Sequence, residues 1–263
     1  MPDGADMSLG AARTSACATL EIRDLGCMRY REALAIQQEL VEKRKQGLIS
    51  DQLLFVEHPH VITQGRNGHA ENLLASEDAL RSAGIEFYPT NRGGDITYHG
   101  PGQIIGYPIL DLREWKRDVV AYVRTIEQAI MDALAEFHIA AGRVPGCTGV
   151  WVNGKKVAAI GVHISRWVTS HGFALNHTTD LRYFQYIVPC GLTKPVTSIE
   201  ELGSDASREQ VLAALSTSFA RQFSRQANWD QPNYDRTSCD QVNCDKPSRH
   251  HEGAGVSYTE TYS

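Results

Sequence analysis

The sequence predicts one α+β domain in which helices flank a mixed or antiparallel β-sheet. Helical segments and short β-prone segments alternate irregularly, so no regular βαβ repeat appears. An Asn-Gly pair at positions 153–154 joins two β-prone runs, which is a strong hairpin signal. The composition is that of an ordinary globular domain, with 42% hydrophobic and 22% charged residues.

The chain of 263 residues divides by composition into one domain and two polar ends. Residues 1–18 are rich in Ala, Gly and Ser and are predicted to be a flexible extension. Residues 230–263 contain Val242 and Val256 as their only Val, Ile, Leu or Met. Such a segment buries too little apolar surface to offset the entropy lost on ordering. It is predicted to be a flexible tail, which leaves residues 19–229 as the folded domain.

Four segments have helical periodicity: residues 30–46, 76–83, 118–139 and a last helix that opens at 207. In segment 118–139 apolar residues recur every three or four positions, and Asp118 can cap the first turn. The last helix opens with Ser207 and Gln210, which have capping-box spacing. Strands are expected at 20–25, 52–57, 85–88, 103–110, 149–152, 155–164, 173–176 and 186–188.

Overall charge and cysteine content restrict the environment and the partners. A net charge of −5 gives no general attraction to nucleic acid or anionic lipid. No apolar run is long enough to span a bilayer, and the N-terminus lacks the apolar core of a secretion signal. We therefore expect a cytoplasmic protein that binds neither nucleic acid nor membrane. In that reducing compartment the six cysteines are expected to be free thiols.

The densest candidate for a binding site is segment 92–103, which holds four glycines, an arginine and a histidine. Glycines let the backbone approach a ligand and present its N–H groups. A sharp turn between two strands would use the same residues. The spacing fits neither of the glycine-rich phosphate-binding motifs.

Cys190 and Lys156 are the candidates for chemistry. Cys190 lies between Pro189 and Gly191 on a constrained backbone, where a thiolate would be a good nucleophile if a nearby cation lowered its pKa. A buried structural cysteine would look the same. Strand alternation places Lys155 and Lys156 on opposite faces, and Lys156 directly precedes an apolar run. We expect Lys156 to face the interior, although two surface lysines beside a turn would give the same pattern.

Two groups of residues have the spacing of metal ligands without being convincing sites. His58 and His60 flank a proline, and no third ligand follows at a suitable distance. The second group, which lies in the polar tail, consists of Cys239, Cys244, His250 and His251. We predict no metal at either.

Six stretches of the chain, in this order, resemble the lipoyl(octanoyl) transferase family. They are 57–66, 92–103, 149–151, 156–161, 171–176 and 189–191, within a span from about residue 54 to 202. The resemblance implies the biotin/lipoate protein ligase fold, similar to class II synthetases, in which a mixed sheet is flanked by helices and a tunnel takes the acyl group. It implies transfer of an octanoyl group, or a lipoyl group, from acyl carrier protein to a lysine of lipoyl domains. Such domains belong to 2-oxoacid dehydrogenase E2 subunits and the glycine cleavage H protein.

The resemblance also implies site residues. Cys190 matches the family's nucleophile and Lys156 its catalytic lysine. For His99 we expect a role in orienting other groups rather than in acid–base catalysis, which is the second choice. A thioester intermediate needs no nucleotide or metal, so no cofactor is expected, and we expect a monomer. Substrate contacts map onto Arg92, Gly93, Gly94, Asp95, Ile96, Thr97, Tyr98, His99, Ala159, Ile160, Gly161, Gly172, Phe173 and Ala174.

Three other functions stay open on the sequence. A lipoate–protein ligase on the same fold would use ATP and the matching lysine, but it would not need Cys190. A non-catalytic carrier-binding protein would tolerate the loss of both Cys190 and Lys156. A cysteine hydrolase would need a histidine partner for Cys190.

Overall fold

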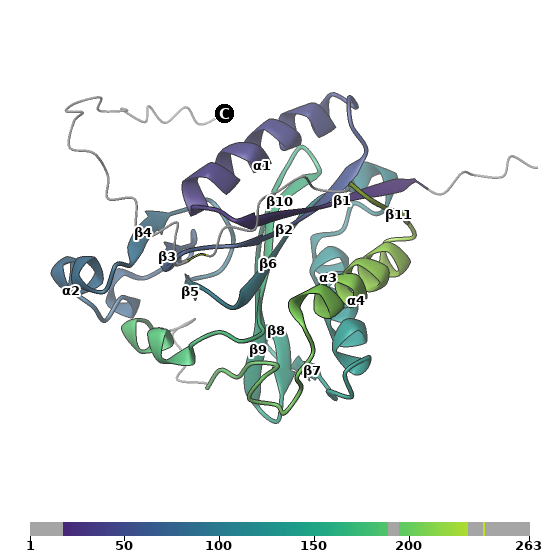
Figure 1. The fold of residues 1–263 in the computed structure, drawn as a ribbon. Coiled ribbons are helices and arrows are strands. Elements are labelled where there is room, and N and C mark those ends of the chain that lie inside the picture. Colours follow the sequence, from purple (N-terminus) through teal and green to yellow (C-terminus); the bar gives the residue numbers. More distant parts are fainter. Residues whose placement is uncertain (1–17, 189–194, 231–238, 240–263) are drawn as a thin grey trace, which may run out of the picture.

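A computed structural model describes residues 18–188, 195–230 and 239 of the chain. Within these residues an eight-stranded sheet forms the centre of the fold (Figure 1). Its strands run in the order β11 (Gln226–Trp229), β1 (Thr19–Cys27), β2 (Asp51–Glu57), β6 (Gln103–Ile109), β10 (Val168–Asn176), β9 (Lys155–Ser165), β8 (Cys147–Val152) and β7 (Gly142–Val144). β1 is parallel to both β11 and β2, whereas every pairing from β2 onwards is antiparallel. The predicted mixed sheet is therefore confirmed.

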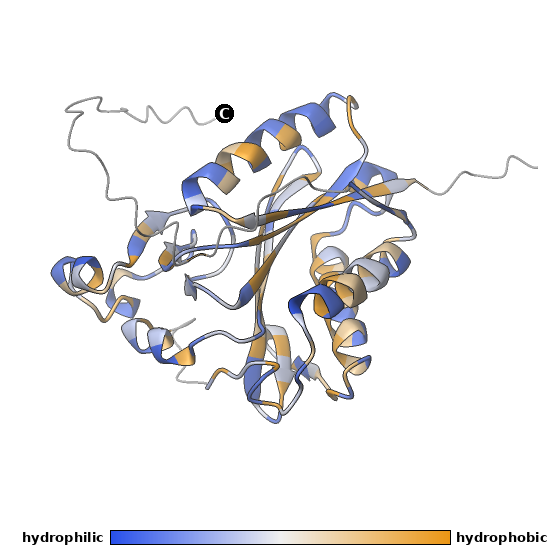
Figure 2. Cartoon of the chain, in the orientation of Figure 1, coloured by the Kyte–Doolittle hydropathy of each residue, from blue (hydrophilic) through white to orange (hydrophobic). Residues whose placement is uncertain are grey.

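Helices cover both faces of this sheet. α1 (Tyr30–Lys45) packs over β6 and β10 on one face, while α3 (Val119–Ala135) and α4 (Arg208–Gln222) lie side by side on the other (Figure 1). Hydrophilic and hydrophobic segments alternate along α1, as expected for a helix with one buried face (Figure 2). The largest apolar cluster joins α3 and α4 to the sheet, and the second joins α1 to it.

A smaller three-stranded sheet stands beside the large one. It has the order β4 (Glu86–Pro89), β3 (Val61–Gln64), β5 (Ile96–His99), and α2 (Glu77–Ser82) lies next to it (Figure 1). Three short 3-10 helices complete the described elements: η1 (Ala70–Asn72), η2 (Leu112–Glu114) and η3 (Leu181–Tyr186). Among the described helices, none is both long and apolar enough to cross a membrane.

Local capping signals correctly predicted where two helices begin. Asp118 accepts a hydrogen bond from the backbone N–H of Ala121, and Ser207 and Gln210 form the predicted capping box. The strand expected at 186–188 is wrong, because η3 occupies the chain up to Tyr186 and a single bridge joins Ile187 to Leu73. The helix expected to reach 139 ends at Ala135, and His138 adopts a left-handed conformation (φ 61°).

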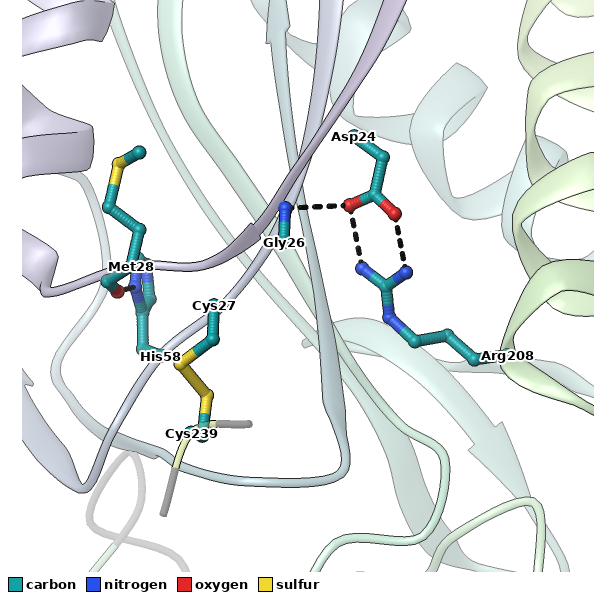
Figure 3. Close-up of a disulfide and its surroundings, with 7 residues drawn as sticks. All are labelled: Asp24, Gly26, Cys27, Met28, His58, Arg208 and Cys239. Atoms are coloured by element: carbon teal, nitrogen blue, oxygen red, sulfur yellow. Dashed lines mark hydrogen bonds and ion pairs between the residues drawn. A yellow bond between two sulfur atoms is a disulfide. The ribbon is translucent and has the colours of Figure 1, made fainter. Parts of the chain in front are cut away.

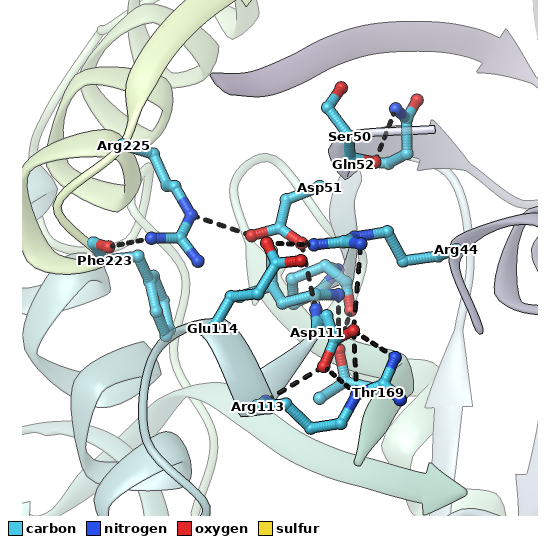
Figure 4. A network of polar contacts seen from close by, with 12 residues as sticks. Arg44, Ser50, Asp51, Gln52, Asp111, Arg113, Glu114, Thr169, Phe223 and Arg225 are labelled. Atoms are coloured by element: carbon cyan, nitrogen blue, oxygen red, sulfur yellow. Dashed lines mark hydrogen bonds and ion pairs between the residues drawn. The ribbon is translucent and has the colours of Figure 1, made fainter. Parts of the chain in front are cut away.

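A network of ion pairs, in which the side chains of Arg44, Asp51 and Arg225 are buried and that of Glu114 is exposed, joins the elements at one end of the sheet (Figure 4). Asp51 on β2 accepts hydrogen bonds from Arg44 of α1 at 2.9 Å and from Arg225 beyond α4 at 2.8 Å. Arg44 also reaches Glu114 of η2 at 2.6 Å. Since removal of one partner leaves a buried charge uncompensated, this network fixes how the helices dock on the sheet.

One disulfide contradicts the expectation that all six cysteines are free thiols. Cys27, the last residue of β1, is bonded to Cys239, close to His58 and Met28 (Figure 3). Only 4% of Cys239 is exposed. The expectation of free thiols is therefore wrong for this pair, and residue 239 is attached to the domain. The rest of the predicted extension and tail falls, apart from residues 18 and 230, outside the described residues.

Candidate active site

A cavity of about 500 Å³ lies along β9 and β10. Its walls include residues 92–97, His99, Lys156, residues 159–161 of β9 and residues 172–174 of β10. Segments that are far apart in the sequence therefore meet around one space. Apart from Tyr98 and Cys190, every residue predicted to be catalytic or to contact substrate lines this cavity.

The loop 92–95 forms one wall of the cavity and is attached on two sides. The backbone N–H of Gly93 donates to the carbonyl of Val162 on β9 at 2.8 Å, and residues 65–67 donate to the loop's carbonyls. Gly94 has a left-handed conformation (φ +84°), which favours glycine. A Cβ on Gly161 would lie 2.8 Å from the carbonyl oxygen of Gly93. Glycine at 161 thus lets the loop lie directly against β9.

Lys156 enters the cavity as the strand alternation predicts. Lys155 is exposed, whereas Lys156 is half-buried and lines the cavity. Across the β8–β9 pair Lys156 lies opposite Trp151, and its Nζ is 4.9 Å from the centre of the indole ring. The backbone of Lys156 is also fixed on its other side, since its N–H donates to the carbonyl of Pro195 at 2.9 Å.

The cavity crosses three neighbouring strands of the large sheet. Ala159, Ala174 and Ile105 are in register across β9, β10 and β6. β9 and β6 run in the same direction, because each is antiparallel to β10. Lys156 lies three residues before Ala159 on β9, and Tyr107 lies two residues after Ile105 on β6. On ideal strand geometry their Cα atoms are about 20 Å apart. Because both residues line the cavity, it extends diagonally across three strands.

The predicted nucleophile, Cys190, lies in segment 189–194, outside the described residues. The described chain resumes at Pro195, and Val196 pairs with Lys156 and lines the cavity. Among the described residues no cluster of three or more His, Cys, Asp or Glu could hold a metal ion.

Comparison with known proteins identifies the family. Residues 29–220 match the lipoyl protein ligase A/B catalytic domain family. An octanoyltransferase of Solibacter usitatus is 66% identical over 202 residues, which cover 77% of this chain and 92% of that protein. The chain belongs to the octanoyltransferase family. An octanoyltransferase of Koribacter versatilis is 48% identical, over 80% of this chain and 86% of that protein. Membership of the octanoyltransferase family makes this protein an acyltransferase that moves octanoyl or lipoyl groups.

Solved structures agree on the fold of this octanoyltransferase family member. A putative lipoate protein ligase from T. acidophilum with bound lipoic acid has a TM-score of 0.68, at 17% identity, over 87% of this chain and 93% of that chain. A lipoate-protein ligase A bound with ATP also has a TM-score of 0.68, over 87% and 92%. At this identity the likeness establishes the fold alone, and it confirms the predicted ligase-type architecture.

Two tyrosines that the sequence did not indicate also belong to the cavity wall. Tyr30 of α1 and Tyr107 of β6 line it. Burial raises the pKa of Tyr30 to about 12, and within the described residues its hydroxyl has no hydrogen-bond partner. His58 donates from Nδ1 to the carbonyl of Met28, so its Nε2 accepts from the Tyr107 hydroxyl. Alternation along β6 could have indicated Tyr107, which shares a face with Ile105.

Tyr98 and His99 lie next to each other in the 92–103 segment but have different surroundings. Tyr98 does not line the cavity, because its ring stacks on Tyr183 and its hydroxyl bonds to His60. The side chain of Tyr98 thus lies outside the cavity wall, and substrate contact at this residue stays a prediction. Both ring nitrogens of His99 are engaged, by Gln103 at 2.8 Å and Thr63 at 3.2 Å. Burial lowers the pKa of His99 to about 3, which favours the orienting role over proton transfer.

Proposed function

We propose that this enzyme transfers an octanoyl or lipoyl group from acyl carrier protein to a lysine of lipoyl domains through a thioester on Cys190. The cavity supports the proposal most directly, because Lys156 lines it together with the glycine-rich loop and both family-matched strand segments. Acceptors would be 2-oxoacid dehydrogenase E2 subunits and the glycine cleavage H protein. The reaction would be the first step of endogenous protein lipoylation, carried out in the cytoplasm by a monomer.

In the first half-reaction the Cys190 thiolate attacks the carbonyl carbon of the carrier thioester. A carbon–sulfur bond to Cys190 forms and the bond to the carrier's sulfur breaks. The Lys156 ammonium stabilises the attacking thiolate and then donates a proton to the departing carrier thiolate. The acyl chain lies along the cavity towards Tyr107, with residues 92–97 beside it.

In the second half-reaction the amine of the acceptor lysine attacks the Cys190 thioester. Lys156, now neutral, accepts the proton that the amine loses, and the Cys190 thiolate leaves. The ammonium and the thiolate are both regenerated, so the cycle needs no nucleotide and no metal. Backbone N–H groups of the Arg92 loop or of Gly191 are candidates to stabilise the oxyanion.

A donor comparison tests this proposal against the ligase alternative. The enzyme is incubated with a lipoyl domain and octanoyl-carrier protein, without ATP and with a chelator present. We expect the mass of the lipoyl domain to increase by one octanoyl group. The matched reaction contains free octanoate and ATP instead, and we expect no modification there. Modification only in the ATP reaction would contradict the proposal and favour a ligase.

A further inference from the structure

A continuous chain of buried hydrogen bonds runs through the core from the cavity wall to Thr197, in the segment that pairs with Lys156. We call it the relay, and its members are Arg92, Thr63, His99, Gln103, Asn176 and Thr197. None of these residues is more than 8% exposed. The relay thus connects β3, β5, β6 and the end of β10 through side chains alone.

The direction of each hydrogen bond in the relay is determined. Thr197 offers a backbone carbonyl, so Asn176 donates to it through Nδ2 at 2.9 Å. The Oδ1 of Asn176 accepts from Nε2 of Gln103, also at 2.9 Å. The Oε1 of Gln103 then accepts from Nδ1 of His99. Loss of one member leaves its neighbours buried with unmade hydrogen bonds.

The hydrogen-bond directions among His99, Thr63 and Arg92, at the other end of the relay, follow in the same way. Since Nδ1 of a neutral His99 carries the proton, its Nε2 accepts from the Thr63 hydroxyl. That oxygen in turn accepts from the Arg92 guanidinium at 3.0 and 3.2 Å. Arg92 forms part of the cavity wall. The relay therefore begins at a residue beside the proposed acyl site.

Asn176 is the point at which the relay reaches Lys156. β10 ends at Asn176, and beyond that end segment 195–197 pairs with Lys156. Asn176 holds this segment twice: its side chain donates to the carbonyl of Thr197, and its carbonyl accepts from Ile199 N–H at 3.0 Å. The N–H of Thr197 donates in turn to the carbonyl of Lys156 at 3.0 Å.

We propose that Asn176, supported by Gln103, is a positioning residue that sets the place of Lys156 through segment 195–199. This inference rests on the proposed function, in which the Lys156 ammonium stabilises the Cys190 thiolate. Without the side-chain amide of Asn176, the Thr197 carbonyl loses its buried donor and the segment beside Lys156 shifts. A small displacement of the ammonium weakens its attraction for the thiolate and raises the thiol pKa.

The test measures the alkylation rate of Cys190 by iodoacetamide against pH, followed by peptide mass spectrometry. The variants are Asn176→Ala and Gln103→Met, which are both neutral, with Lys156→Met as the reference. Gln52→Met is the matched control, since Gln52 is also buried but bonds to Ser50 at the far end of β2. Melting temperatures are recorded for all.

We expect Asn176→Ala and Gln103→Met to move the alkylation midpoint to higher pH by about half a unit or more, in the direction of Lys156→Met. Gln52→Met should lower the melting temperature and leave the midpoint unchanged. If Lys156→Met moves the midpoint and the two relay variants do not, the positioning role is refuted. If Lys156→Met also leaves the alkylation midpoint unchanged, both the positioning role and the proposed function are refuted. Should Asn176→Ala not fold, Gln103→Met decides alone.

Discussion

Trp151 lies directly opposite Lys156 in the β8–β9 ladder, with the Lys156 Nζ 4.9 Å from the centre of its indole ring. The electron-rich face of an indole attracts an ammonium group. The aromatic ring also limits where the flexible lysine side chain can go. The pair therefore holds a positive charge at the cavity wall, and a nearby cation is what lowers the pKa of a thiol nucleophile.

Replacing Lys156 should impair catalysis far more than replacing its neighbour. Lys156→Met should slow transfer by roughly 10²–10⁴-fold, the range found for groups that move protons in the transition state. Lys155→Met is the matched control, because Lys155 is exposed and does not line the cavity. Steady-state transfer rates to a lipoyl domain measure both. Equal losses in the two variants would contradict the assignment of Lys156.

The contact between the Arg92 loop and β9 should be intolerant of a side chain. In Gly161→Ala the new methyl group would lie 2.8 Å from the Gly93 carbonyl, so the loop must move. We expect a loss of about 1–3 kcal/mol in the free energy of unfolding and a transfer rate reduced roughly 10–100-fold. Gly142→Ala is the control, because a Cβ there meets nothing within 4 Å. Unchanged turnover in Gly161→Ala would show that the loop position does not matter.

Much of this site could be predicted from local sequence patterns. Strand alternation was sufficient to orient Lys156 and Lys155, because neighbouring residues on a strand point to opposite faces. Asp118 and Ser207 identified the starts of two helices for an equally local reason. The substrate-contact segments came from the resemblance to a family, and the cavity brings them together.

The features that escaped prediction depend on contacts between distant parts of the chain. Tyr30 opens a helix, and nothing local indicates that its ring will reach a cavity formed by β5, β6 and β9. Segment 186–188 is β-prone, yet Tyr183 stacks on both His60 and Tyr98 and the chain before Ile187 stays helical. Cys27 and Cys239 are 212 residues apart, and composition suggested no pairing between them.

Acid should destabilise the fold through its buried histidines. Burial lowers the pKa of His58 to about 4 and those of His99 and His171 to about 3. In the unfolded chain these groups titrate near 6.5, so unfolding between about pH 4 and 6.5 takes up protons. Stability should therefore fall as the pH drops below about 6.5. Denaturant titrations from pH 7 to 4.5 measure this, and His58→Gln should reduce the slope by about one proton. The same dependence of stability on pH in the wild type and in His58→Gln would contradict the prediction.

The Cys27–Cys239 bridge should contribute to stability in oxidised protein. In the chain-entropy description, closing a loop of this length contributes up to about 5 kcal/mol. We expect Cys239→Ser, a reducing agent, or truncation after Trp229 to lower the melting temperature by several degrees. Cys244→Ser, in the same tail, is the control. Equal melting temperatures for oxidised wild type, reduced wild type and Cys239→Ser would refute a stabilising bridge.

Intact mass spectrometry after mixing the enzyme with octanoyl-carrier protein alone tests the central claim most directly. The account predicts a mass gain of one octanoyl group on the enzyme, on the peptide that contains Cys190. Hydroxylamine should remove the group, because it cleaves thioesters and leaves amides intact. Cys190→Ala should fold and acquire no group. No adduct on the wild-type enzyme, or an adduct that resists hydroxylamine, would contradict covalent catalysis by Cys190.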